Sequence, residues 1–315
     1  MSNLTIRVVV AILGIPVILA ASLVGRLWFF SLVAISSSLA LWEFYRLAGA
    51  KGVKPIVGLG IVAGLSVNLS FYHAKLQSFF LNMFEGVGIA LVFPTQSQLF
   101  LILFVLIVLI VCLTELFRNA DSPLLNIAVT LLGVGYISLF FGTLVGIREL
   151  FVPLDFPMLR YFPSESSFMD AASIAEVYSW GGNTVISLFA CIWICDTGAY
   201  VVGRSMGRHK LFPRVSPNKT WEGAVAGFFA AIGAAIAAKV LLLEYMTFTQ
   251  AGLFGLTVGI FGQMGDLVES LFKRDAGVKD TSSIIPGHGG VFDRFDSLIF
   301  VSPIVYLYLD FVVFS

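Results

Sequence analysis

The feature that most constrains this chain is a succession of long apolar runs. A helix needs roughly 20 apolar residues to cross the hydrocarbon core of a bilayer. Nine runs approach or reach that length, near 6–24, 27–47, 55–72, 98–116, 124–147, 182–203, 222–243, 249–271 and 295–314. Because a helix satisfies its backbone hydrogen bonds internally, the runs predict an all-α polytopic membrane protein with about nine transmembrane helices.

The amino-acid composition supports the bilayer as the solvent of this chain. Of its 315 residues, 58% are hydrophobic and 12% are charged, whereas a soluble domain carries about 25% charged residues. So little polar surface could not cover a soluble globule of this size. The 19 basic residues balance the 19 acidic ones, and we expect the lipid bilayer, with no nucleic acid, as the partner.

The basic loops predict how the chain is oriented. They lie at 46–54, at Arg118, at 204–219 and at 273–294. Nine spans put all four loops on one face, which the positive-inside rule makes the cytoplasmic one, and put the acidic loop 148–178 on the other. The apolar stretch 79–93 is short and contains Glu85. We expect it to be interfacial or re-entrant, because a tenth span there would place the basic loops on opposite faces.

A change in composition near residue 180 divides the chain. We assign 1–120 to N-terminal transmembrane helices that support the site and line a lipid pocket, 121–180 to a middle helix with an acidic extracytoplasmic loop, and 181–315 to a C-terminal catalytic transmembrane region. Glu43 and Glu115 lie inside early spans. Two interpretations of these glutamates stay open: ion partners in helix packing, or lining of the lipid pocket.

The first group of candidate site residues begins at Asp196, a carboxylate inside an apolar run. Ionisable groups within a membrane are costly and therefore mark functional sites. The loop after Asp196 combines basic side chains, hydroxyls and glycines, which can hold a polyphosphate. The binding candidates are Asp196, Arg204, Ser216, Lys219 and Thr220. For the basic residues alone, an ordinary positive-inside loop is the alternative.

The second group lies between residues 266 and 296 and indicates metal-assisted phosphate chemistry. Asp266 sits inside a span, and Asp293 and Asp296 begin the next one. Converging helix ends can hold a hard cation such as Mg²⁺ through carboxylate oxygens, and basic side chains beside them can hold phosphates bridged to that metal. The candidate catalytic residues are Asp266, Asp293, Lys273, Arg274, Lys279, Asp280, His288, Arg294 and Asp296.

Small residues accompany these charges. Pro-Gly-His-Gly-Gly, residues 286–290, allows a tight turn that brings backbone N–H groups close to a ligand. Ser270, Gly289 and Gly290 therefore join the binding candidates.

Ordinary structural alternatives exist for several residues between 266 and 296. Lys273 and Arg274 could form a topological anchor, Asp280 could be a solvated carboxylate, and His288 could cap a turn.

Residues 270–296, SLFKRDAGVKDTSSIIPGHGGVFDRFD, resemble along their whole length the signature of phosphatidate cytidylyltransferases, also called CDP-diacylglycerol synthases. The upstream segments DTGAY, GRHKL and SPNKTWEG also resemble this family, with one departure at Asn218, where the family often has a lysine. The resemblance covers about 180–300 well. The N-terminal half is similar in hydropathy and in fragments such as WEFYR.

The resemblance implies a reaction in which CTP and phosphatidate give CDP-diacylglycerol and pyrophosphate. It also implies a divalent metal held by Asp266 and Asp293. We expect Mg²⁺, with Mn²⁺ as a substitute and a second cation such as K⁺ as an addition. The implied location is a bacterial-type inner (plasma) membrane or an organelle membrane, with the active site on the cytoplasmic side. We leave a homodimer open.

Three other functions compete with this one. A related enzyme of CDP-archaeol or polyprenol type would differ mainly in an acceptor pocket that apolar helices do not reveal. An ion-coupled transporter predicts inverted repeats, which the sequence lacks. A scaffold without catalysis would need no paired acids. The sequence contains no Walker loop and no serine–histidine–acid arrangement, which favours direct in-line transfer between bound phosphates.

Overall fold

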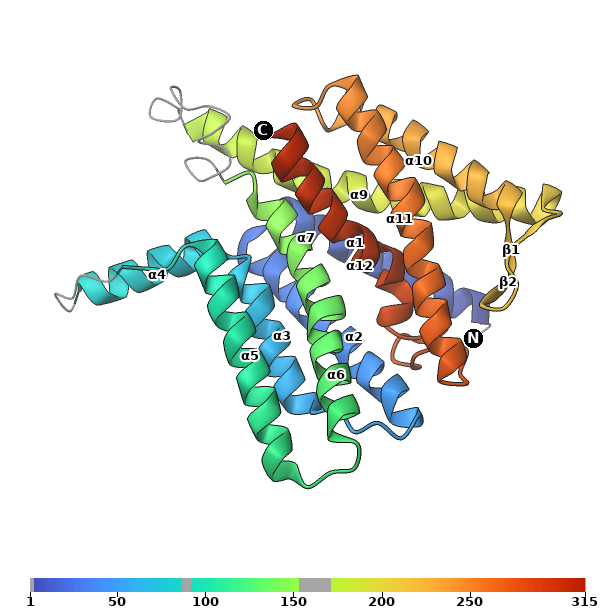
Figure 1. Ribbon diagram of the computed structural model, residues 1–315. Helices are drawn as coiled ribbons and strands as arrows, with labels where there is room; N and C mark the ends of the chain where they lie inside the picture. Colours follow the sequence, from blue (N-terminus) through green and yellow to red (C-terminus); the bar gives the residue numbers. More distant parts are fainter. Residues whose placement is uncertain (1–2, 87–91, 153–170, 315) are drawn as a thin grey trace.

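The computed structural model describes residues 3–86, 92–152 and 171–314. These ranges are mostly helical, with one antiparallel two-stranded hairpin, and the predicted all-α class is confirmed (Figure 1). The elements are α1 (Asn3–Val24), α2 (Arg26–Ala50), α3 (Val57–Ser70), α4 (His73–Glu85), α5 (Gln96–Arg118), α6 (Pro123–Gly133), the π-helical turn η1 (Val134–Ser138), α7 (Leu139–Glu149), α9 (Ala171–Met206), β1 (Lys210–Phe212), β2 (Ser216–Thr220), α10 (Trp221–Leu241), α11 (Phe248–Asp275), α12 (Phe292–Tyr308) and the π-helical turn η3 (Leu309–Val313).

Within the described part, seven helical segments are long and apolar enough to cross a membrane: Arg26–Ala50, Gln96–Arg118, Pro123–Glu149, Ala171–Met206, Trp221–Leu241, Phe248–Asp275 and Phe292–Val313. The helices α3 and α4 are bent by 89° and give an eighth span if the pair counts as one. The apolar part of α1, Val8–Val24, is shorter. The chain is thus an integral membrane protein, but the count of nine spans is not confirmed.

The stretch predicted to be interfacial or re-entrant, 79–93, falls partly on α4. This helix projects away from the other helices (Figure 1). Its bend against α3 is compatible with a broken span or a re-entrant path. Residues 87–91 lie outside the described part, so the path of the whole stretch stays a prediction.

Small residues let α9 and α10 run side by side at close range (Figure 1). Gly223 and Gly227 lie one turn apart on the buried face of α10. A Cβ atom on Gly227 would lie 2.8 Å from the carbonyl oxygen of Cys195, and one on Gly223 would lie 2.6 Å from that of Ala199. Small residues at such spacing allow helix backbones to touch in a membrane. The contact brings the end of the β1–β2 hairpin, which precedes α10, against α9, where a Cβ atom on Gly203 would lie 3.1 Å from Thr220 Oγ1.

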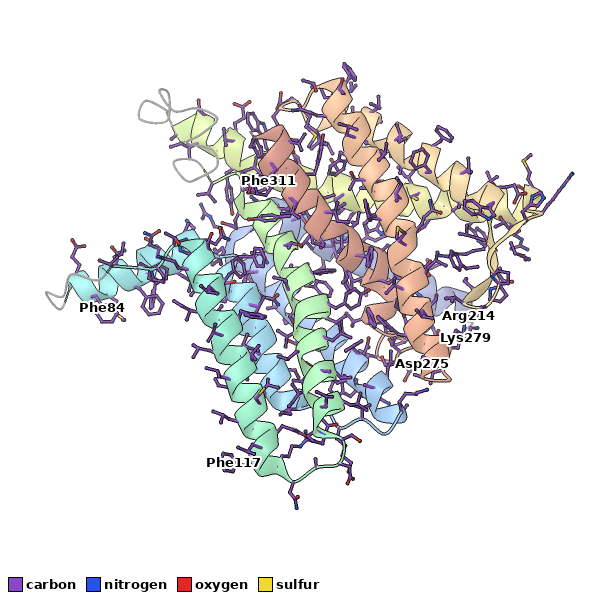
Figure 2. All side chains as sticks on the ribbon, viewed as in Figure 1. Phe84, Phe117, Arg214, Asp275, Lys279 and Phe311 are labelled. Carbon is purple, nitrogen blue, oxygen red and sulfur yellow. The ribbon has the colours of Figure 1, made fainter. Side chains whose placement is uncertain are left out.

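The four basic loops meet at one end of the molecule. Contacts between them are Lys51 Nζ to Asp275 Oδ1 at 3.2 Å, Arg118 Nη1 to Lys54 O at 2.6 Å, and Arg274 Nε to Val215 O at 3.3 Å. Figure 2 shows Arg214, Asp275 and Lys279 close together near the end of α11, whereas Phe84 and Phe311 lie far from them. The loops share one face, as the orientation prediction requires. Which face is cytoplasmic stays a prediction.

Arg148, on α7, is a fully buried cation that joins three helices. Its guanidinium donates to the carbonyl oxygens of Ser22 and Leu23, at 2.9 and 3.3 Å, at the C-terminal end of α1. It also donates to Tyr178 O at 2.9 Å and lies 3.9 Å from the centre of the Tyr178 ring. A cation at this end of a helix stabilises carbonyl groups that lack partners within the helix.

We expect Arg148→Met to lower the free energy of unfolding by about 3 kcal/mol, because several charge-assisted hydrogen bonds disappear inside the protein. Thermal unfolding in detergent would measure the loss. Arg46→Met is the matched control, since Arg46 is exposed and stacks on Trp42 at 4.7 Å. Equal unfolding temperatures for the two variants would contradict the assignment of Arg148 as a structural cation.

Candidate active site

A cavity of about 1390 Å³ lies between α1, α2, α9, α11, α12 and the loops that join them. Part of its wall is apolar and comes from Leu13 and Val17 on α1 and from Phe189 and Trp193 on α9. The charged part of the wall consists of Asp196, Arg204, Lys219, Asp266, Lys273, Asp280, Asp293, Arg294 and Asp296. A cavity with both kinds of wall can take a ligand that has apolar chains and a charged head.

Three carboxylates gather where α11 meets α12. Asp266, Glu269 and Asp296 each offer an oxygen atom, and these atoms lie within 4.8 Å of one another. The helices approach closely because α11 has a glycine here: a Cβ atom on Gly265 would lie 2.7 Å from the carbonyl oxygen of Asp296. Glu269 is fully buried, and its Oε1 has no hydrogen-bond partner among the described residues. Such oxygen ligands fit a hard divalent cation.

Asp266 is oriented by two neighbours. Lys219, from β2, places its Nζ 2.6 Å from Asp266 Oδ2. The Ser270 hydroxyl donates to Asp266 Oδ1 at 3.3 Å from one turn further along α11. The contact with Lys219 joins the two groups of candidate residues, which are far apart in the sequence, into one site.

Lys273 lies between Glu269, a member of this carboxylate group, and Asp293. Its Nζ is 2.7 Å from Glu269 Oε2 and 2.8 Å from Asp293 Oδ1. The other oxygen of Asp293 accepts hydrogen bonds from Thr281 N at 2.9 Å, Thr281 Oγ1 at 2.9 Å and Gly290 N at 2.7 Å. Buried carboxylates need partners of this kind. Asp293 therefore fastens the loop before α12 to α11.

Comparison with known proteins identifies the family. The sequence profile of the Cytidylyltransferase family matches residues 5–312. The chain belongs to this family. It is 32% identical over 309 residues to the phosphatidate cytidylyltransferase of Synechocystis sp., covering 97% of this chain and 96% of that protein. Similar proteins of the same name from Staphylococcus epidermidis and Staphylococcus aureus are 36% identical over 237 residues and 37% identical over 241 residues, each covering 68% of this chain and 91% of the relative.

Most of the site residues predicted for this member of the cytidylyltransferase family line the cavity described above. The predicted residues on its wall are Asp196, Arg204, Lys219, Thr220, Asp266, Lys273, Asp280, His288, Asp293, Arg294 and Asp296. Thr220 also has a structural role, because its hydroxyl accepts a hydrogen bond from Gly223 N at 3.2 Å and so caps the N-terminus of α10. The structure thus brings both predicted groups together, while their individual roles stay predictions.

Six predicted residues do not form the cavity wall: Arg274, Lys279, Ser216, Ser270, Gly289 and Gly290. Arg274 donates to Val215 O and to Val278 O and so holds the loop after α11. Gly289 has a φ of +88°, a conformation that favours glycine, and Gly290 donates its N–H to Asp293. These two glycines shape the turn beside the cavity.

The metal ligands predicted from the resemblance were Asp266 and Asp293. The compact carboxylate group contains Asp266 but joins it to Glu269 and Asp296. Asp293 is instead engaged by Lys273, and its part in metal binding stays a prediction. Sequence reasoning overlooked Glu269, although the spacing of Asp266, Glu269 and Lys273 places all three on one helical face.

The two glutamates with open interpretations have different surroundings. Glu115 pairs with Arg118 at 3.3 Å and accepts from Asn126 Nδ2 at 2.6 Å, so it is an ion partner in helix packing. Glu43 is fully buried on α2 and does not line the cavity. Its hydrogen bonds all come from the segment 281–292, an arrangement that neither interpretation predicted.

Proposed function

We propose that this protein transfers the cytidylyl group of CTP to phosphatidate, giving CDP-diacylglycerol and pyrophosphate. The observation that carries the proposal is the continuity of the cavity, which joins carboxylates and basic side chains to an apolar wall within the membrane helices. A water-soluble nucleotide and a lipid can meet in such a cavity. The names of the similar proteins from Synechocystis and Staphylococcus support the same substrates.

The proposed reaction needs no strong general base. An oxygen of the phosphatidate phosphate, already anionic, attacks the α-phosphorus of CTP. The bond from that phosphorus to the oxygen bridging to the β-phosphate breaks, and pyrophosphate leaves with the electron pair. The obstacle is repulsion between two anions. Lys219, Lys273 and Arg294 face the cavity and would lower this repulsion, the kind of electrostatic stabilisation that is usually the largest catalytic contribution.

Mg²⁺ is the cation we propose for the site, with Mn²⁺ as a substitute. Asp266, Glu269 and Asp296 would hold it, because they offer hard oxygen ligands and the buried Glu269 Oε1 lacks another partner among the described residues. When bound, the cation supplies neutralisation of charge on the α-phosphate and the leaving group. A second cation such as K⁺ stays a prediction.

The proposed location is the inner (plasma) membrane, with the site on the cytoplasmic side. The basic loops 204–219 and 273–294 contribute predicted site residues to the cavity wall. The other two basic loops contact 273–294 directly or through each other, and basic loops mark the cytoplasmic face. CTP would reach the site from that side. A homodimer stays a prediction.

An assay with two labels tests the proposed function. Purified protein is incubated with phosphatidate, Mg²⁺ and CTP carrying the label in either the α- or the γ-phosphate. We expect α-label in CDP-lipid and γ-label in pyrophosphate. Lipid that carries γ-label would instead show a kinase, and product with only an archaeol-type acceptor would show a different lipid substrate. Absence of nucleotidyl product with every acceptor would overturn the proposal.

A further inference from the structure

Glu43 makes an unusual set of contacts for a carboxylate inside a membrane helix. Its Oε1 accepts from Ser282 Oγ at 2.5 Å and from Val291 N at 3.0 Å. Its Oε2 accepts from Thr281 Oγ1 at 3.0 Å and from Phe292 N at 2.7 Å. All four donors belong to the segment 281–292, which is more than 200 residues away in the sequence. One carboxylate on α2 thus holds both ends of this segment.

No basic side chain compensates the charge of Glu43 among the described residues. A buried carboxylate without compensation is costly. Here two hydroxyls and the amides of Val291 and Phe292 provide the compensation. These two amides belong to the N-cap and the first residue of α12, at the positive end of the helix dipole. The N-cap residue of α12, Val291, has no side-chain capping group of its own. Glu43 therefore caps α12 from another helix.

The same segment is held on its other side by Asp293. Thr281 Oγ1 lies 3.0 Å from Glu43 Oε2 and 2.9 Å from Asp293 Oδ2, although a hydroxyl has a single proton to donate. The turn leaves no room for a side chain at Gly290, where a Cβ atom would lie 2.5 Å from Glu43 Oε2. A shift of Glu43 would therefore move Thr281 and Gly290, and with them the three donors that hold Asp293 Oδ2.

We propose that Glu43 is a positioning residue for the active site. It fixes the segment 281–292, and through Thr281 and Gly290 it sets Asp293 against Lys273 on the cavity wall. Glu43 itself does not touch the cavity, so it acts on catalysis only through these neighbours. The expected effect of Glu43 on kcat rests on the proposed function. Its expected effect on the order of the segment 281–292 does not.

Glu43→Gln tests the proposal, with Glu115→Gln as the matched control. Both glutamates are buried in N-terminal helices, but Glu115 contacts Asn126 and Arg118, away from the cavity. The amide oxygen of glutamine can accept two of the four hydrogen bonds, and its NH₂ group faces the other two donors. Amide hydrogen exchange, kcat and KM for CTP are measured on the full-length proteins.

For Glu43→Gln we expect amide exchange in 281–292 to become about tenfold faster and kcat to fall about tenfold or more, because small displacements of site groups are costly. KM for CTP should change much less than kcat. Glu115→Gln should keep the wild-type kcat and wild-type exchange in this segment. Unchanged exchange in Glu43→Gln, or loosened exchange with wild-type kcat, would overturn the proposal.

Ser282→Ala keeps the proposal testable if Glu43→Gln does not fold. It removes one donor to Glu43 and leaves every acid in place, and exposed Ser283 provides the control Ser283→Ala. Faster exchange with lower kcat in Ser282→Ala alone supports the proposal, and identical behaviour of the two serine variants contradicts it. If the wild type makes no CDP-lipid, the proposed function fails, and the exchange rates still decide whether Glu43 holds the segment.

Discussion

Asp266→Asn should nearly abolish formation of CDP-diacylglycerol, with kcat lower by about 100- to 1000-fold, the range seen when a group that stabilises transition-state charge is removed. Asp266 is the member of the carboxylate group that also contacts Lys219, at 2.6 Å. Asparagine keeps the size and can still accept from Ser270, but it loses the negative charge that a divalent cation requires. Initial rates at saturating CTP and phosphatidate would measure the change.

Asp275→Asn is the control for this variant. Asp275 ends the same helix, α11, and its side chain is exposed. Its partner, Lys51, is also exposed, and exposed ion pairs contribute little. We expect activity within about twofold of the wild type. A wild-type rate for Asp266→Asn, or an equal loss in both variants, would remove Asp266 from the proposed site.

Lys273→Met should reduce both stability and activity. Lys273 is largely buried and is shared by Glu269 and Asp293, whose side chains are 0% and 3% exposed. Removing one partner from a buried ion pair costs about 3–5 kcal/mol, because the remaining charge is left without compensation. The unfolding temperature in detergent and the rate of CDP-lipid formation are the two measurements.

A double variant separates the two effects of Lys273. In Lys273→Met/Glu269→Gln the unpaired charge of Glu269 is gone, so part of the lost stability should return while activity stays low. Lys51→Met removes an exposed lysine from the same end of the molecule and should leave both quantities near wild type. If Lys273→Met unfolds like Lys51→Met, the buried charge network does not stabilise the protein as described.

The sequence predicts the helices well because length and hydropathy decide them in a bilayer. It fails at the bend between α3 and α4, where each helix is too short to span alone and only packing sets the 89° angle. The count of spans depends on whether this bent pair is one span. That angle cannot be derived from the number of apolar residues.

The predicted charged residues come together because carboxylates in apolar runs are costly and are retained where they act. The crossing angle of α11 and α12 beside Gly265 decides which carboxylates converge. This angle cannot be derived from the sequence. Glu269 was therefore overlooked although it is in the same group as Asp266. The partners of Glu43 were also beyond sequence reasoning, since Thr281 lies 238 residues away.

The contact between α2 and the segment 281–292 also limits how this chain can be divided. A C-terminal fragment that begins near residue 181 would leave the first amides of α12 and the hydroxyls of Thr281 and Ser282 without the acceptor they have in the whole chain. A chimera that joins the C-terminal half of this chain to the N-terminal half of a relative keeps these hydrogen bonds only if the relative's second helix supplies an acceptor where Glu43 stands.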